Sequence, residues 1–114
     1  MSEANEADRT RGGQEFSESL KETLLQYFRL LLCMYYTYIL KSELNEDLFY
    51  VGCTSNLRRR FLEHNRGDCS HTAQYRPWRL INYTAFLRRA KAEEFERYLK
   101  TCSGRKFQWR HMGE

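Results

Sequence analysis

Large apolar side chains recur at helical spacing in the first third of the chain. They are three or four positions apart and therefore share one helix face: Leu20, Leu24, Phe28 and Leu31. Ser17 stands before them and can act as an N-cap, although no acidic partner completes a capping box. The pattern predicts an appended amphipathic helix over residues 17–33. Residues 1–16 are polar and charged, and we expect them to form a disordered tail.

The pattern changes to one typical of β-strands at Met34. Residues 35–40 and 48–53 are rich in β-branched and aromatic side chains, as strands are. The polar residues 41–47 between them indicate a turn. Two strands this close along the chain most simply pair as an antiparallel hairpin.

The remaining pattern alternates between the two element types. In order, it predicts a helix over 56–65, a strand over 79–86, a helix over 88–102 and a tail over 108–114. Gly67 is expected to end the first of these helices and Gly104 the second. The result is an α/β chain of the α+β class, with β-β-α-β-α order and a three-stranded sheet flanked by helices, plus the N-terminal helix.

Composition and charge narrow the classes of function. A chain of 114 residues suits one compact domain. Residues 1–33 carry four basic and six acidic side chains, whereas residues 34–114 carry 15 basic and nine acidic ones. The excess of positive charge therefore lies in the second part, where it favours an anionic partner such as nucleic acid.

The cysteines and the apolar runs exclude other classes. The four cysteines form no C-x-x-C pair, which argues against a zinc knuckle or a redox motif. The N-terminal residues do not resemble a signal peptide, and the apolar cluster at 30–34 is too short to cross a bilayer. We therefore expect reduced thiols, a cytoplasmic location and no membrane partner.

Several polar residues on these elements suit one site. Side chains alternate along a strand, so a hairpin can bring Tyr38 and Tyr50 to one surface, where Gly52 would leave space for a phosphate. Arg60 and His64 are four apart, and therefore neighbours on one helix face. A guanidinium can neutralise a phosphate bidentately.

Four blocks of the sequence are similar to one nuclease family. They are Tyr36-Thr37-Tyr38, Tyr50-Val51-Gly52, the helix from Leu57 to Asn65 with Arg76-Pro77-Trp78 after it, and the stretch from Ala92 to Thr101. In this order and spacing they resemble the GIY-YIG nuclease superfamily, particularly its small stand-alone bacterial members. The resemblance covers residues 34–107, although Tyr36 and Thr37 stand where the first signature has Gly and Ile.

The resemblance implies a metal-dependent endonuclease that hydrolyses nucleic-acid phosphodiesters, with DNA favoured. It implies catalytic roles for Tyr38, Tyr50, Arg60, His64 and Glu96, and it makes Glu96 the ligand of one Mg²⁺ or Mn²⁺ ion. Further residues are candidates for binding nucleic acid: Arg59, Gly52, Arg76, Arg79 and Lys100. Tyr38 is the better candidate for the base, and its pKa near 10 would have to be lowered by a cation such as Arg60.

Each of these assignments has a structural alternative. The tyrosines can simply pack in the sheet, His64 can be a surface residue, and Glu96 can form an i,i+4 ion pair with Lys100. Trp78 and Trp109 are more often packing residues than base-stacking platforms. The alternative function is a non-catalytic nucleic-acid-binding or interaction module that retains the fold. A regulatory protein that binds a protein partner through helix 17–33 is a third.

Overall fold

The computed structural model describes residues 17–114, so the disorder expected for residues 1–16 falls outside the part described. The chain divides into two units between Leu32 and Cys33. The first unit contains helix α2, Glu18–Leu32, which confirms the predicted helix. The Leu20 amide donates to the Ser17 hydroxyl over 3.3 Å, as expected for an N-cap. No side chain of α2 is buried, and a protein partner for it stays a prediction.

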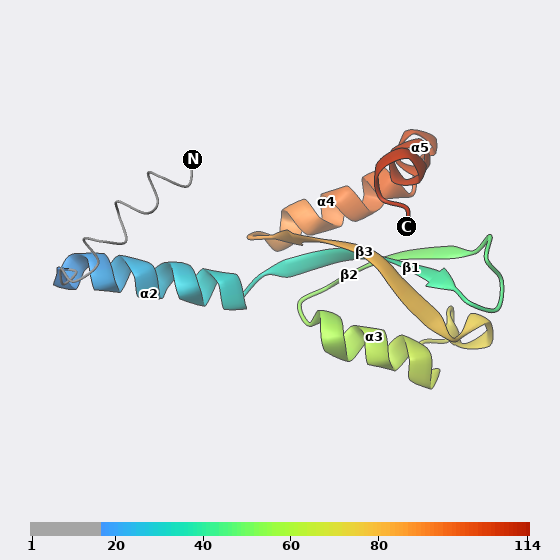
Figure 1. Cartoon of the computed structure of the whole chain (residues 1–114), viewed down its shortest axis with the longest axis horizontal. Coiled ribbons are helices and arrows are strands. Elements are labelled where there is room, and N and C mark those ends of the chain that lie inside the picture. The colour runs from blue at the N-terminus through green and yellow to red at the C-terminus, as the bar shows by residue number, and fades with distance from the viewer. Residues whose placement is uncertain (1–16) are drawn as a thin grey trace, which may run out of the picture. The chain divides into compact units, whose positions relative to one another are not determined.

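The second unit is built on a three-stranded antiparallel sheet (Figure 1). Its strands are β1 (Tyr35–Ser42), β2 (Phe49–Thr54) and β3 (Trp78–Phe86), in the order β2-β1-β3. The predicted hairpin of the first two strands is confirmed. The strand β1 is central and β2 lies at an edge, and Tyr38 pairs with Gly52 across them.

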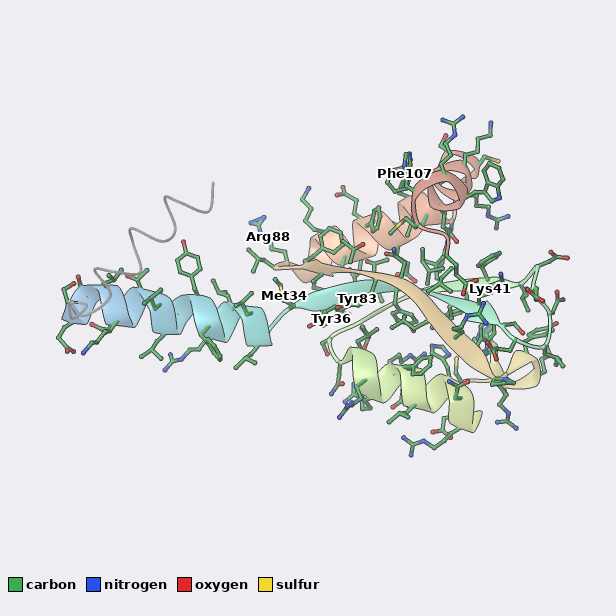
Figure 2. All side chains as sticks on the ribbon, viewed as in Figure 1. Met34, Tyr36, Lys41, Tyr83, Arg88 and Phe107 are labelled. Atoms are coloured by element: carbon green, nitrogen blue, oxygen red, sulfur yellow. The ribbon has the colours of Figure 1, made fainter. Side chains whose placement is uncertain are left out.

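The strands β1 and β3 also pair through their side chains. The rings of Tyr36 and Tyr83 meet edge to face, with centroids 5.9 Å apart (Figure 2). Such a cross-strand aromatic contact stabilises the pairing of neighbouring strands.

Helices cover both faces of this sheet, which confirms the predicted α+β fold. Figure 1 shows α3 (Leu57–Arg66) on one side of the sheet, and α4 (Arg89–Leu99) with α5 (Cys102–His111) on the other. Side chains along β1 point alternately to the two faces of the sheet, so the core consists of two clusters, one on each face. Tyr38 and Leu40 pack with residues of α3, whereas Ile39 packs with residues of α4 and α5.

Local hydrogen bonds define both ends of α3 and connect it to β3. Its first turn is capped by Asn56, whose side chain accepts from the Arg59 amide over 3.0 Å. Gly67 ends it in the left-handed conformation, at φ 87°, which confirms the expected stop. The Asn65 side chain then holds the start of β3, because it accepts from the Trp78 amide over 2.6 Å and donates to its carbonyl over 3.1 Å.

The prediction for the C-terminal segment is wrong. Gly104 does not end a helix but lies inside α5, whose N-cap is Thr101 with a hydroxyl that accepts from the Gly104 amide over 3.0 Å. A Cβ at Gly104 would collide with the Tyr98 carbonyl, so this glycine permits close packing of two helices. Residues 108–111 are helical, and Met112 is buried in the core instead of lying in a tail.

No helix within residues 17–114 has the length and the apolar composition needed to cross a membrane.

Candidate active site

Two tyrosines from the hairpin lie together on the face of the sheet covered by α3. The ring centroids of Tyr38 and Tyr50 are 6.3 Å apart. Gly52 lies opposite Tyr38, and a Cβ on Gly52 would come within 2.5 Å of the Tyr38 hydroxyl. The space that we expected a phosphate to use is therefore filled by Tyr38. Gly52 serves the close approach of that hydroxyl to the strand.

A chain of hydrogen bonds runs inward from Tyr38. Its hydroxyl lies 2.7 Å from Nε2 of His64, and Nδ1 of His64 lies 2.7 Å from the Thr72 hydroxyl. Thr72 donates its one hydrogen to the Cys69 carbonyl over 3.4 Å. It must then accept from Nδ1–H, which leaves Nε2 to accept from the Tyr38 O–H. The protonation of His64 is thus set by the loop that follows α3.

His64 is fully buried, so the interpretation of this residue as a surface histidine is wrong. Burial, with a smaller contribution from the nearby Arg60 guanidinium, lowers the pKa of the imidazole from its usual 6.5 to about 4. The ring is therefore neutral at pH 7, with Nε2 available as a proton acceptor. A second ring contact, 4.9 Å between centroids, joins His64 to Tyr50.

Arg60 supplies a fixed positive charge beside these rings. Its guanidinium pairs with the Glu63 carboxylate over 3.0 Å, and it also donates to the Cys69 sulfur over 3.7 Å. The hydrogen bond to Glu63 raises the pKa of Arg60 above its usual range, so the charge is permanent. The side chain remains 33% exposed, which leaves part of the guanidinium open to an anion.

In the protein alone, the Tyr38 pKa is not lowered overall as a base would require, although Arg60 acts in that direction. Tyr38 is only 1% exposed, and desolvation by burial raises the pKa of its hydroxyl well above 10. Arg60 opposes this shift but is the smaller effect. A stable phenolate is therefore disfavoured, and Tyr38 can take a proton only by passing its own to His64.

The structure does not bring Glu96 into contact with this group. Glu96 lies on α4, on the opposite face of the sheet, where its carboxylate accepts from Lys100 over 3.0 Å. The pKa of the Cys53 thiol is raised mainly by burial, and Glu96 adds to the rise, which places Glu96 near this residue of β2. The tyrosine group and Glu96 thus flank the same edge strand from its two faces.

The candidate cations for nucleic-acid binding are dispersed. Arg59 is exposed on α3 and lies 3.7 Å from Glu63, and Arg76 packs over Gly67 at the end of the same helix. Arg79 of β3 instead forms hydrogen bonds to the carboxylates of Glu43 and Glu114. Of the cations assigned to nucleic acid, Arg59 and Arg76 thus belong to the α3 side.

Sequence reasoning missed Thr72 as a member of the site. It stands eight residues after His64 in a polar loop, and no spacing rule connects the two. The Trp78 indole fixes this loop by donating to the Thr72 carbonyl over 2.9 Å. Only the packed structure shows that the buried hydroxyl of Thr72 faces a ring nitrogen.

A divalent ion fits the donors available. No three His, Cys, Asp or Glu side chains gather into a ligand set among residues 17–114. Glu96, however, is a partly exposed carboxylate that pairs, within residues 17–114, with one exposed lysine. Mg²⁺ is commonly held by one or two carboxylates, with water and substrate phosphate completing its shell. The donor set suits such an ion and does not suit a structural zinc.

Thr72→Val is expected to destabilise the domain, whereas Thr72→Ser should not. Valine has nearly the shape of threonine but leaves the buried Nδ1–H of His64 without an acceptor. An unpaired buried polar group costs about 1–3 kcal/mol. Urea-induced unfolding of the two variants measures this difference, and equal midpoints would show that the hydrogen bond contributes nothing.

The buried His64 also predicts how stability depends on pH. Because the folded pKa of about 4 is below the usual 6.5, the unfolded chain binds the extra proton first. The stability that His64 contributes is complete above pH 6.5 and is lost as the pH falls toward 4, by at most about 1.4 kcal/mol per pH unit. Unfolding should therefore show a gap between wild type and His64→Gln that narrows over this range. The exposed His71→Gln variant is the control, and a constant gap for His64→Gln would contradict the account.

Comparison with known proteins agrees with this architecture. Residues 34–108 match the GIY-YIG catalytic domain. A UPF0213 protein of Listeria welshimeri is 34% identical over 70 residues, which are 60% of this chain and 76% of that protein. A UPF0213 protein of Clostridium perfringens is 34% identical over 68 residues, 59% of this chain and 71% of its own length.

A larger fungal protein is also similar. The structure-specific endonuclease subunit slx1 of Aspergillus fumigatus is 30% identical over 83 residues, 68% of this chain. The match spans only 20% of the fungal protein. Domains of this kind are typical of nucleases that use a divalent metal and act on DNA. With the family match covering the sheet and the helices on both its faces, the chain belongs to the GIY-YIG family.

Proposed function

We propose that this protein is a metal-dependent endonuclease that hydrolyses phosphodiester bonds in DNA. The observation that supports this most strongly is the buried hydrogen-bonded pair of Tyr38 and His64, with the Arg60 guanidinium beside it. A hydroxyl, a neutral imidazole and a fixed cation are the groups needed to remove a proton and stabilise a phosphoryl transition state.

Arg60 is the proposed stabiliser of negative charge. Its guanidinium is partly exposed and always protonated. Charge grows on the non-bridging oxygens as water attacks phosphorus, and a planar guanidinium can donate to two oxygens at once. Glu63 binds one terminal nitrogen of Arg60 and the Cys69 sulfur binds the other, so together they fix the direction of the guanidinium.

Tyr38 and His64 are the proposed proton path. As the attacking water loses a proton to the Tyr38 oxygen, Tyr38 passes its own proton to Nε2 of His64, so no phenolate accumulates. The imidazolium that forms keeps its Nδ1–H bond to Thr72. The deprotonated water oxygen then bonds to phosphorus, and the bond from phosphorus to the leaving sugar oxygen breaks. The leaving oxygen takes a proton from solvent, and His64 returns its proton through Tyr38 to solvent after the reaction. The ring of Tyr50 contacts His64 and is more exposed than that of Tyr38. Its hydroxyl is the proposed group that positions the attacking water.

Glu96 is the proposed metal ligand, with Mg²⁺ or Mn²⁺ as the ion. When bound, such an ion neutralises phosphate charge and stabilises the leaving oxygen. To bind the ion, Glu96 must break its ion pair with Lys100. This costs little, because an exposed i,i+4 pair contributes little stability. Lys100 then becomes available to a phosphate, as do Arg59 and Arg76 on the α3 side.

The proposal of a DNA substrate rests on the family and on charge. GIY-YIG domains are typical of nucleases that act on DNA. The name of the fungal relative describes a structure-specific endonuclease subunit, which supports testing branched DNA beside single strands and duplexes. The excess of basic side chains in residues 34–114 suits a polyanion.

Glu96→Gln is expected to slow metal-dependent cleavage strongly while leaving the fold intact. The amide keeps the size of the side chain but loses the charge that holds the ion, so cleavage should slow by at least about a hundredfold. The measurement is cleavage of end-labelled single-stranded, duplex and branched DNA with Mg²⁺, Mn²⁺ or EDTA. Glu94→Gln is the matched control, because Glu94 lies on the same helix in an exposed pair with Lys91.

Two outcomes would overturn the proposal. One is cleavage that persists in EDTA or in Glu96→Gln. The other is binding of DNA with no cleavage by any form under any metal condition, which would support the non-catalytic binding module instead.

A further inference from the structure

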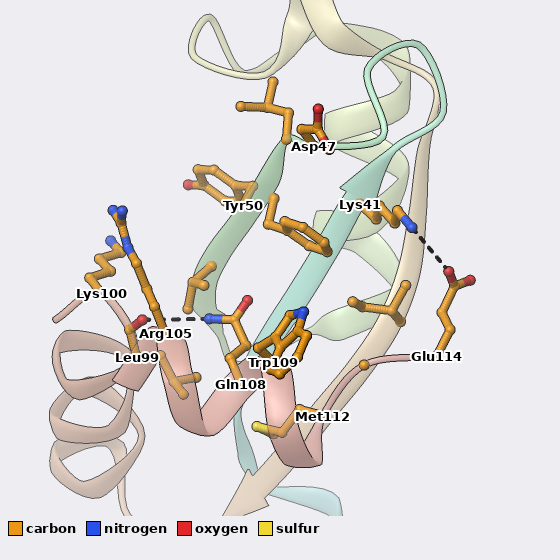
Figure 3. Close-up of a pocket in the computed structure, with 15 residues that line it drawn as sticks. Lys41, Asp47, Tyr50, Leu99, Lys100, Arg105, Gln108, Trp109, Met112 and Glu114 are labelled. Carbon is orange, nitrogen blue, oxygen red and sulfur yellow. Dashed lines mark hydrogen bonds and ion pairs between the residues drawn. The ribbon is translucent and has the colours of Figure 1, made fainter. Parts of the chain in front are cut away.

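A second site lies on the other face of the domain from α3. Figure 3 shows a pocket between the edge strand β2 and the helices α4 and α5. Its volume is about 980 Å³, at the upper end of the range for sites that hold small organic groups. The pocket exists because residues 102–112 fold back as α5 and Met112 instead of leaving the domain as a tail.

Exposed aromatic side chains line this pocket. Trp109 is 85% exposed, whereas the other tryptophan, Trp78, is 4% exposed and packs in the core. Phe49 of β2 is also exposed and lines the same pocket. An indole this exposed buries little of its surface in the domain, so the face of its ring is available to a flat partner.

Cations stand beside this aromatic surface. Figure 3 draws Lys100 and Arg105 at one end of the pocket, with Trp109 between them and Glu114. Arg105 forms no ion pair among the described residues, and Lys100 is held only by its exposed contact with Glu96. A flat aromatic platform next to an arginine without an ion pair among residues 17–114 and a lysine in one exposed pair is a combination that can bind a base together with its phosphate.

The pocket borders the proposed active site at one shared residue, Tyr50 of β2. Tyr50 lines the pocket and also contacts His64 on the other side of β2. Lys100, the C-cap of α4, lines it as well and stands four residues after Glu96. A strand that places its scissile phosphate between Tyr50 and Glu96 would therefore carry a neighbouring nucleotide into the pocket.

We propose that this pocket binds an unpaired base of the DNA substrate, stacked on the Trp109 indole, with its phosphate held by Arg105 and Lys100. This inference deepens the proposed nuclease function and rests on it for the position of the cleaved bond. A base inside an intact duplex is stacked on its neighbours and cannot reach Trp109. The substrate class is accordingly DNA with a single-stranded segment beside the cut.

Tryptophan fluorescence of the full chain tests the proposal without any cleavage. A short single-stranded oligonucleotide of mixed sequence is titrated in EDTA, beside a blunt duplex of the same sequence. The single strand should quench the exposed, red-shifted Trp109 emission. Anisotropy of a labelled single strand should show about tenfold weaker binding to Trp109→Leu. Arg105→Gln should also weaken it, and Arg110→Gln, on the same helix but outside the pocket lining, should weaken it much less.

The outcomes separate this inference from the nuclease proposal. Equal binding of the single strand by wild type and Trp109→Leu would overturn the inference. It would also be overturned if Trp109→Leu weakened binding of the duplex as much as binding of the single strand. Quenching by an apolar peptide but not by the single strand would overturn it as well. None of these results depends on metal or cleavage. A chain that binds single strands through Trp109 but never cuts would keep the inference and refute only the nuclease.

Discussion

Arg60→Ala is expected to lower the single-turnover rate of DNA cleavage by at least about a hundredfold, with little change in stability. Removal of one donor aimed at developing charge typically costs about a hundred- to a thousandfold. Among residues 17–114, Arg60 is the guanidinium that lowers the pKa of the Tyr38 hydroxyl and therefore lies beside it. The pair of Arg60 with Glu63 lies near the surface, so its loss costs little folding energy.

Arg58→Ala is the matched control, because it removes the same charge from an exposed position two residues earlier on α3. It should bind DNA slightly more weakly and cut at close to the wild-type rate once the substrate is saturating. If Arg58→Ala and Arg60→Ala lose the same activity, Arg60 acts only as part of a general positive field. The proposed transition-state role would then be wrong.

Tyr38→Phe is expected to reduce cleavage by about a hundred- to ten-thousandfold, the usual range for general acid–base groups. Phenylalanine keeps the ring in the core beside Leu40 but has no hydroxyl to pass a proton to His64. The buried Nε2 of His64 also loses its donor, so the free energy of unfolding should fall by about 1–3 kcal/mol. Both quantities are measured on the same purified variant.

Tyr36→Phe supplies the comparison, since Tyr36 is two residues away on the same face of β1 and contacts Tyr83 instead of His64. Its loss of a hydroxyl should leave cleavage nearly unchanged. Cleavage by Tyr38→Phe at the wild-type rate would show that the buried hydroxyl takes no part in the reaction. Tyr50, which lies nearer the opening, would then be the remaining candidate among the tyrosines.

The order of the elements could be read from the sequence because local signals are strong in this chain. The density of aromatic residues predicted the hairpin, and Gly67 marked the end of α3. Gly104 misled the prediction, because a glycine that permits close helix packing looks the same in a sequence as one that ends a helix. The helix α5 was therefore missed, and with it the pocket that Trp109 lines.

The candidate site was predictable only as far as residue types and alternation allow. The meeting of Tyr38 with Tyr50 followed from the period of the strand. The burial of His64 and the partner hydroxyl of Thr72 depend on how one loop packs against Trp78, which no local pattern encodes. For the same reason the rise of the Tyr38 pKa could not be predicted: burial outweighs the nearby guanidinium.

The central claim is that Tyr38 and Arg60 act as one catalytic unit on a phosphodiester. The most direct test is the single-turnover cleavage rate of wild type, Tyr38→Phe, Arg60→Ala and the double variant on one labelled DNA with saturating Mg²⁺. Groups that act as a unit give losses that do not add, so the double variant should be little slower than the slower single variant. Losses that multiply fully, or a wild-type protein that leaves the DNA intact, would contradict the account.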